Sequence, residues 1–124
     1  MPDITRQVED VVARAGVASG ICFVHVPHTT AGVGFNETHD RDVARDILHS
    51  LSDLVPAARD YRDAEGNAGA HARAMLVGSR VLLPVRDGRL ASGTWQGVLF
   101  CEFDGPGRRR AGASVVTETV SRLQ

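Results

Sequence analysis

The stretch VHVPHTTAGVGFNE, residues 24–37, joins the end of a β-branched apolar run to a set of polar side chains. The run breaks at Pro27, which cannot donate a backbone hydrogen bond to a neighbouring strand. His28, Thr29 and Thr30 come next, followed by small residues that let a ligand approach the backbone. We interpret the stretch as a strand end that carries a binding site; a capped strand end with a surface histidine is the alternative.

Composition places the chain among single-domain globular proteins. Its 124 residues, 43% of them hydrophobic and 23% charged, are enough for one hydrophobic core. The net charge of −1 argues against a protein that works by binding nucleic acid or an anionic membrane surface. All of its basic residues are arginines, which excludes lysine Schiff-base chemistry. We therefore predict one domain over residues 1–124.

Neither the cysteines nor the apolar runs indicate a secreted or membrane protein. Cys22 and Cys101 both lie in strand-like apolar runs, so we expect buried free thiols rather than a disulfide framework. No apolar run approaches the roughly 18 residues that a transmembrane helix needs. The segment MPDITRQVED has acidic residues and no hydrophobic signal region. We therefore expect a cytoplasmic protein without a membrane partner.

Apolar residues at helical spacing predict two main helices and one short helix. The first follows the candidate cap Asp3 and ends near Gly16, and the second spans about residues 41–54 before Pro56 stops it. Residues 57–69 lack periodicity and are expected to form a loop. The short helix is expected over residues 70–77, with Gly78 at its end.

Runs of β-branched residues between turn signals predict a mostly antiparallel sheet or sandwich. Expected strands cover residues 20–26, 33–37, 79–85, 94–103 and 108–117, with a hairpin turn at 86–89. The last strand is expected to run antiparallel to the one before it. Strands joined by hairpins, with helices set apart, indicate an α+β fold.

His28 and His71 are the first candidates for catalytic or metal-binding residues. The chain has no HExxH or CxxC motif, so spacing alone does not predict a metal site. If the fold brings the two imidazoles together, Asp63 or Glu37 can add a carboxylate, which makes a known catalytic set for zinc or another divalent ion. Two separate surface histidines are the alternative. Glu37 is either a ligand or general base, or a residue that interacts with the dipole of the next helix.

Arginines and amides form a second set of candidates. On a strand, Arg108 and Arg110 would share one face and grip a phosphate or carboxylate; a solvated strand edge is the alternative. Trp95, the only tryptophan, is expected in the core or at a subunit interface. Gln96 beside it either orients a ligand or pairs across strands. The remaining candidates for ligand binding are Thr29, Thr30 and Asn67.

Together these motifs resemble the YjbQ-like family, whose members are often labelled secondary thiamine-phosphate synthase enzymes. The resemblance extends in order from about residue 3 to residue 118, and the motifs are specific in combination. They are HTTAGVGFNE, LVP at residues 54–56, GNAGAH at 66–71, GTWQ at 93–96 and DGPGRRR at 104–110.

The resemblance implies a compact α+β fold, a homotrimer with sites near subunit boundaries, and a site for a divalent metal or an anion. The family's histidines correspond to His28 and His71. Family members usually have a third histidine two residues after the loop tyrosine, where this chain has Asp63 after Tyr61. The resemblance therefore implies zinc or magnesium held by two histidines, with Asp63 as an oxygen ligand.

The activity that the resemblance implies is a weak synthesis of thiamine phosphate, in which a phosphorylated thiazole displaces pyrophosphate from a pyrimidine. Arg108, Arg110 and the metal would hold the leaving pyrophosphate, with Glu37 as a nearby acid or base. We therefore expect a small metal- or phosphate-binding enzyme of the transferase type. The alternative is a non-catalytic trimeric protein that binds a phosphorylated metabolite, and a nucleic-acid role ranks third.

Overall fold

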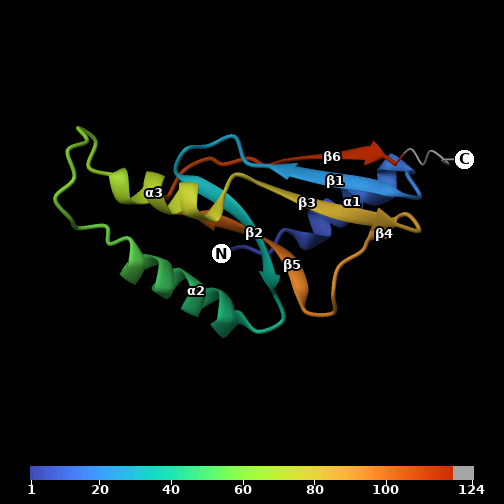
Figure 1. Ribbon diagram of the computed structural model, residues 1–124, viewed down its shortest axis with the longest axis horizontal. Helices are drawn as coiled ribbons and strands as arrows, with labels where there is room; N and C mark the ends of the chain where they lie inside the picture. Colours follow the sequence, from blue (N-terminus) through green and yellow to red (C-terminus); the bar gives the residue numbers. More distant parts are fainter. Residues whose placement is uncertain (119–124) are drawn as a thin grey trace, which may run out of the picture.

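The computed structural model describes residues 1–118 as an α+β arrangement of helices and antiparallel strands (Figure 1). This confirms the predicted fold class. The elements, in chain order, are α1 (Thr5–Ala15), β1 (Gly20–His25), β2 (Ala31–Glu37), α2 (Arg41–Leu54), α3 (Ala68–Val77), β3 (Arg80–Arg86), β4 (Arg89–Leu90), β5 (Gln96–Glu102) and β6 (Gly112–Thr117).

The strands form two sheets, and every strand pair is antiparallel. Four strands pair in the order β4-β3-β1-β6, and β2 pairs with β5 as a two-stranded ribbon. The hairpin turn between β3 and β4 has Asp87 at φ 53° and Gly88 at φ 74°, which confirms the turn predicted from the sequence. None of the helices within residues 1–118 is long and apolar enough to cross a membrane.

The core lies between α1 and the inner face of the four-stranded sheet and extends along β2 and β5. Burial alternates along β1, where Cys22 and Val24 are buried while Ile21 and His25 are exposed. In β5, by contrast, residues 97–101 are all buried, because both faces of that strand are covered. The buried apolar residues of the main cluster are Val8, Val12, Cys22, Val24, Val26, Ala31, Val33, Leu83, Val85, Val98 and Phe100.

Helix α2 differs from the other two helices because none of its residues is buried. It begins at the expected residue, and the Asp40 side chain before it accepts a hydrogen bond from the Asp42 N–H. Its far end is tied to α3, where Arg73 Nε donates to the Val55 carbonyl at 2.8 Å. Figure 1 shows α2 lying apart from the four-stranded sheet.

The expectation for the last strand was wrong in two respects. The last strand starts at Gly112 rather than at residue 108, and it pairs with β1 instead of β5. Its partner was not recognisable locally, because β1 lies at the other end of the sequence. Trp95 was expected in the core or at a subunit interface. Within the protomer it is 61% exposed, and its ring meets His39 edge-on with centroids 5.2 Å apart, so the core alternative is wrong and the interface alternative stays a prediction.

Candidate functional site

The corner between β1 and β2 carries the histidine and the two threonines that the sequence singled out. After β1, Val26 N–H donates to the Ser79 carbonyl at 2.8 Å, and Phe103 N–H donates to the Thr30 carbonyl at 3.1 Å. The corner is therefore fixed between β3 and the end of β5. Its side chains differ in burial, since His28 is half-buried, Thr29 is exposed and Thr30 is 6% exposed.

His28 and His71 line one open pocket, although they come from distant parts of the sequence. The pocket has a volume of about 390 Å³ and lies between the corner and α3. His71 is in the first half of α3, one helical turn before Met75. The side chains of His71 and Met75 therefore face the same pocket. The lining residues are His28, Thr29, Ala31, His71, Ala74, Met75, Gly78 and Ser79.

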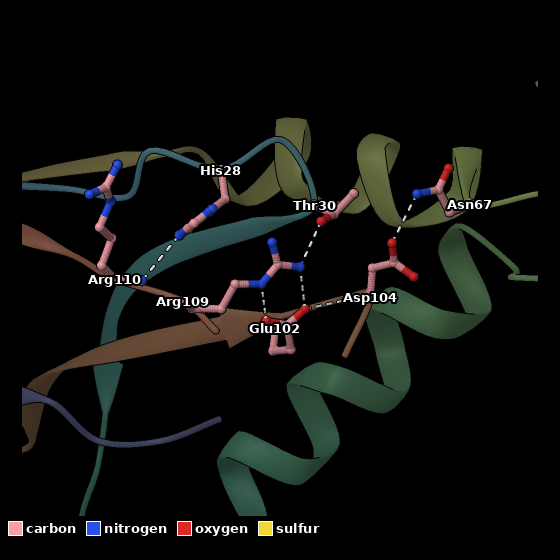
Figure 2. A network of polar contacts seen from close by, with 7 residues as sticks. All are labelled: His28, Thr30, Asn67, Glu102, Asp104, Arg109 and Arg110. Atoms are coloured by element: carbon pink, nitrogen blue, oxygen red, sulfur yellow. Dashed lines mark hydrogen bonds and ion pairs between the residues drawn. The ribbon is translucent and has the colours of Figure 1, made fainter. Parts of the chain in front are cut away.

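Arg109 connects the corner to the end of β5 (Figure 2). Its Nε donates to one oxygen of Glu102, and its Nη2 donates both to the other oxygen at 2.6 Å and to Thr30 Oγ1 at 2.7 Å. The pairing with Glu102 is bidentate, and the bond to Thr30 satisfies the one buried polar side chain found within residues 1–118. The hydrogen bond from Arg109 also holds the pKa of the Glu102 carboxyl below its usual range.

The segment that carries Arg109 also contacts a pocket residue through its backbone. Arg110 N–H donates to His28 Nε2 at 3.1 Å, as Figure 2 shows. Nε2 is therefore occupied as an acceptor in this contact. Nδ1 is the ring nitrogen that His28 has left for a ligand. The side chains of Arg108 and Arg110 are exposed, whereas Arg109 is half-buried.

The loop before α3 is organised by its own polar side chains. Asp63 Oδ2 accepts from the Asn67 N–H at 2.8 Å, and Asn67 Nδ2 donates to Asp104 Oδ2 at 2.9 Å. Asn67 thus links α3 to the turn that follows β5 (Figure 2). Asp63 is not among the residues that line the pocket of His28 and His71.

A divalent ion needs more donors than this pocket supplies. Within residues 1–118 no group of three or more His, Cys, Asp and Glu side chains is placed to hold a metal ion. His28 Nε2 already accepts from Arg110, and Asp63 accepts from Asn67. The described part of one protomer therefore supplies two imidazoles but not a complete ligand set for the metal that the family resemblance implies, and the predicted metal site stays a prediction.

Glu37 and Gln96 lie together, but away from the histidines. They are partners in the β2–β5 register, at the end of the ribbon opposite the Ala31–Glu102 pair that adjoins the corner. Gln96 Oε1 accepts from Gly93 N–H at 2.8 Å, which closes the turn before β5. The structure thus brings His28, Thr29 and His71 together in one pocket and places Glu37 and Gln96 elsewhere in the protomer.

Sequence reasoning missed Arg109 and Glu102. The prediction of a strand over residues 108–117 assigned Arg108 and Arg110 to one face and left Arg109 without a role. Residues 108–111 lie outside any strand, so that alternation does not apply. The available signal was Glu102, an acidic residue that ends an apolar strand a few positions before three arginines.

The fold and the pocket define a class, that of small α+β proteins with a histidine-lined pocket beside an arginine-bearing turn. The chain belongs to the family described as UPF0047 protein YjbQ-like, whose model matches residues 1–118. This confirms the family resemblance inferred from the motifs.

Similar proteins match this chain over most of their length. UPF0047 protein YugU of Bacillus subtilis is 44% identical over 110 residues, which cover 88% of this chain and 83% of YugU. A crystal structure of a YjbQ/UPF0047-family protein from Clostridium acetobutylicum has a TM-score of 0.91 and 44% identity, covering 93% of this chain and 89% of that one. A YbjQ-like protein from Sulfolobus solfataricus has a TM-score of 0.91 and 37% identity, covering 94% and 86%. None of these names specifies an activity.

Proposed function

We propose that the protein binds the phosphate group of a small metabolite in the pocket lined by His28 and His71. The observation that carries the proposal is the convergence of these two imidazoles, far apart in sequence, on one open pocket. Hydroxyl groups of Thr29 and Ser79 line the same pocket and can donate to phosphate oxygens. No acidic side chain is among the lining residues, so the pocket suits an anion.

The arginine turn supports the same ligand. The backbone N–H of Arg110 contacts His28, and the Arg110 side chain is exposed beside this contact, although it does not line the pocket itself. Arg109 is committed to Glu102, which leaves Arg108 and Arg110 as the arginines of this turn that are exposed to solvent. Guanidinium groups bind phosphate through paired hydrogen bonds. We assign these two arginines to the outer part of the ligand's phosphate or pyrophosphate.

A divalent metal is the second candidate, and its support is the pairing of two histidines in one pocket. Its test is elemental analysis of protein purified without added metal, with His28→Ala and His71→Ala as variants and His49→Ala as the control. An ion held at this site is lost in the two pocket variants and kept in the control. Equal metal content in all four proteins removes the assignment.

From the family resemblance we further propose a homotrimer with sites near subunit boundaries and a transfer reaction in which pyrophosphate leaves a pyrimidine. Glu37 and Gln96 lie away from the histidines of their own protomer, so a direct role for them requires a second copy of the chain. Incubation with the pyrimidine pyrophosphate and the phosphorylated thiazole tests this reaction. Turnover that is lost in His71→Ala supports an enzyme. Saturable binding with turnover equal to that variant supports the non-catalytic binding protein instead.

A further inference from the structure

The segment that follows β5 contacts both walls of the pocket. At one end of this segment, Arg110 N–H donates to His28 Nε2 at 3.1 Å. At the other end, Asp104 Oδ2 accepts from Nδ2 of Asn67, which lies just before α3, at 2.9 Å (Figure 2). The segment therefore connects the corner that carries His28 to the helix that carries His71.

Glu102 holds the two ends of this segment together. Its Oε1 accepts from Asp104 N–H at 2.9 Å, and both of its carboxylate oxygens accept from Arg109. Arg109 also donates to the buried Thr30 at 2.7 Å. Because the same carboxylate binds both ends, the segment is a fixed support to which α3 is attached.

A side-chain contact attaches the start of α3, whereas a backbone hydrogen bond attaches its end. At the end, Val33 N–H of β2 donates to the Gly78 carbonyl at 3.0 Å. At the start, the Asn67 carbonyl accepts from His71 N–H at 3.3 Å, while the Asn67 side chain donates to Asp104. The residue that Asp104 binds is therefore the residue that begins the helical turn of His71.

The other contacts at this end of α3 lead toward α2. A Cβ atom on Gly69 would lie 3.0 Å from the Pro56 carbonyl oxygen, and Arg73 Nε donates to the Val55 carbonyl at 2.8 Å. Helix α2 has no buried residue, so these contacts do not attach α3 to the core. Among the side-chain hydrogen bonds found within residues 1–118, the one from Asn67 joins the start of α3 to the segment after β5.

We propose that Asn67 and Asp104 are positioning residues, which set the placement of His71 relative to His28 and thereby the phosphate affinity of the pocket. Neither residue is among those that line the pocket, so both act through α3 rather than by contact with the ligand. The effect on affinity rests on the proposed phosphate binding, whereas the placement of His71 does not.

Two substitutions of Asp104 form a matched pair that tests the proposal. Asp104→Ala and Asp104→Asn remove the same negative charge, but only asparagine keeps an oxygen that accepts from Asn67. Calorimetric titration with pyrophosphate is expected to show an affinity about threefold to tenfold lower for Asp104→Ala, and within about twofold of the unmodified protein for Asp104→Asn. Asn67→Ala is expected to match Asp104→Ala. The double alanine variant is expected to lose no more than either single variant, because all three lack the same contact.

Imidazole NMR of the ligand-free protein separates this inference from the proposed function. The His71 resonance is expected to shift in Asp104→Ala and Asn67→Ala and to stay in place in Asp104→Asn. Unchanged resonances of His25 and His39 show that each variant is folded. A His71 resonance that is the same in all four proteins would overturn the proposal, as would equal affinities of Asp104→Ala and Asp104→Asn in a protein that binds pyrophosphate. If the unmodified protein does not bind pyrophosphate, the proposed function fails, and the His71 resonance still decides this inference.

Discussion

Arg109 and Glu102 form a two-bonded ion pair that fixes the turn after β5 beneath the corner between β1 and β2. The pair is largely shielded, with the side chains 19% and 26% exposed. Because Arg109 also donates to Thr30, one guanidinium joins segments separated by 79 positions in the sequence. The backbone N–H next to it, that of Arg110, then meets His28 Nε2. The pocket geometry therefore depends on this pair.

Arg109→Lys is expected to destabilise the protein by about 1–3 kcal/mol, because a single ammonium cannot bond both Glu102 oxygens and Thr30 in the same geometry. Urea denaturation measures the free energy of unfolding. Arg108→Lys, a neighbouring exposed position, is the control and is expected to change it by less than about 0.5 kcal/mol. Equal effects of the two substitutions would show that the ion pair does not hold the turn.

Stability is expected to depend on pH through Glu102. The hydrogen bond from Arg109 lowers the pKa of this carboxyl from its ordinary value of 4.5. A depressed pKa in the folded protein contributes stability that is fully present above 4.5 and is lost as the pH falls through the lower folded value. The free energy of unfolding, measured at several pH values below about 5, is expected to fall more steeply in the unmodified protein than in Glu102→Gln. Parallel curves would contradict the assignment.

Gly20→Ala is expected to weaken the pairing of β1 with β6. A methyl group at position 20 would overlap the backbone carbonyl of Val116, which cannot move without breaking the ladder. Overpacking of this kind costs about 1–3 kcal/mol. Gly34→Ala is the matched control in β2, because a methyl group there meets nothing within 4 Å. Thermal melts that shift equally for both variants would show that the strand contact is looser than the structure indicates.

Both cysteines are expected to be unreactive in the folded protein. Cys22 is 0% exposed and Cys101 is 2% exposed, and burial raises the pKa of the Cys101 thiol to about 11. Very little thiolate therefore exists at neutral pH. A thiol-specific colorimetric reagent is expected to leave both thiols unmodified in the native protein and to titrate both after denaturation. Rapid labelling without denaturant would mean that β1 or β5 opens readily.

The sequence was sufficient for the elements that obey local rules. Helical spacing located α2 within its observed bounds, and the Asp-Gly pair located the β3–β4 hairpin. It was insufficient for β6, because the choice of β1 over β5 as a partner depends on long-range packing that leaves no local pattern. The absence of buried residues in α2 was also not predictable, since an apolar stripe predicts that a helix face packs but does not identify the surface it packs against.

The candidate site was likewise predictable only in part. Residue type and position in turns identified His28 and His71, and the fold placed both on one pocket. The roles of the three consecutive arginines depend on the backbone conformation after the turn. The amino-acid sequence does not determine this conformation, so Arg109 was assigned no role. Asp63 was a candidate ligand because it lies between the two histidines in sequence and matches the family's third histidine; in the protomer its carboxylate accepts from the Asn67 N–H just before α3.

The central claim is that His28 and His71 share one phosphate-binding pocket, and imidazole NMR of a pyrophosphate titration tests it most directly. The chain has five histidines, so His25, His39 and His49 serve as internal controls in the same sample. We expect the resonances of His28 and His71 to shift together with a single dissociation constant while the other three stay in place. Pyrophosphate that leaves both pocket histidines unchanged, or shifts only one of them, would contradict it.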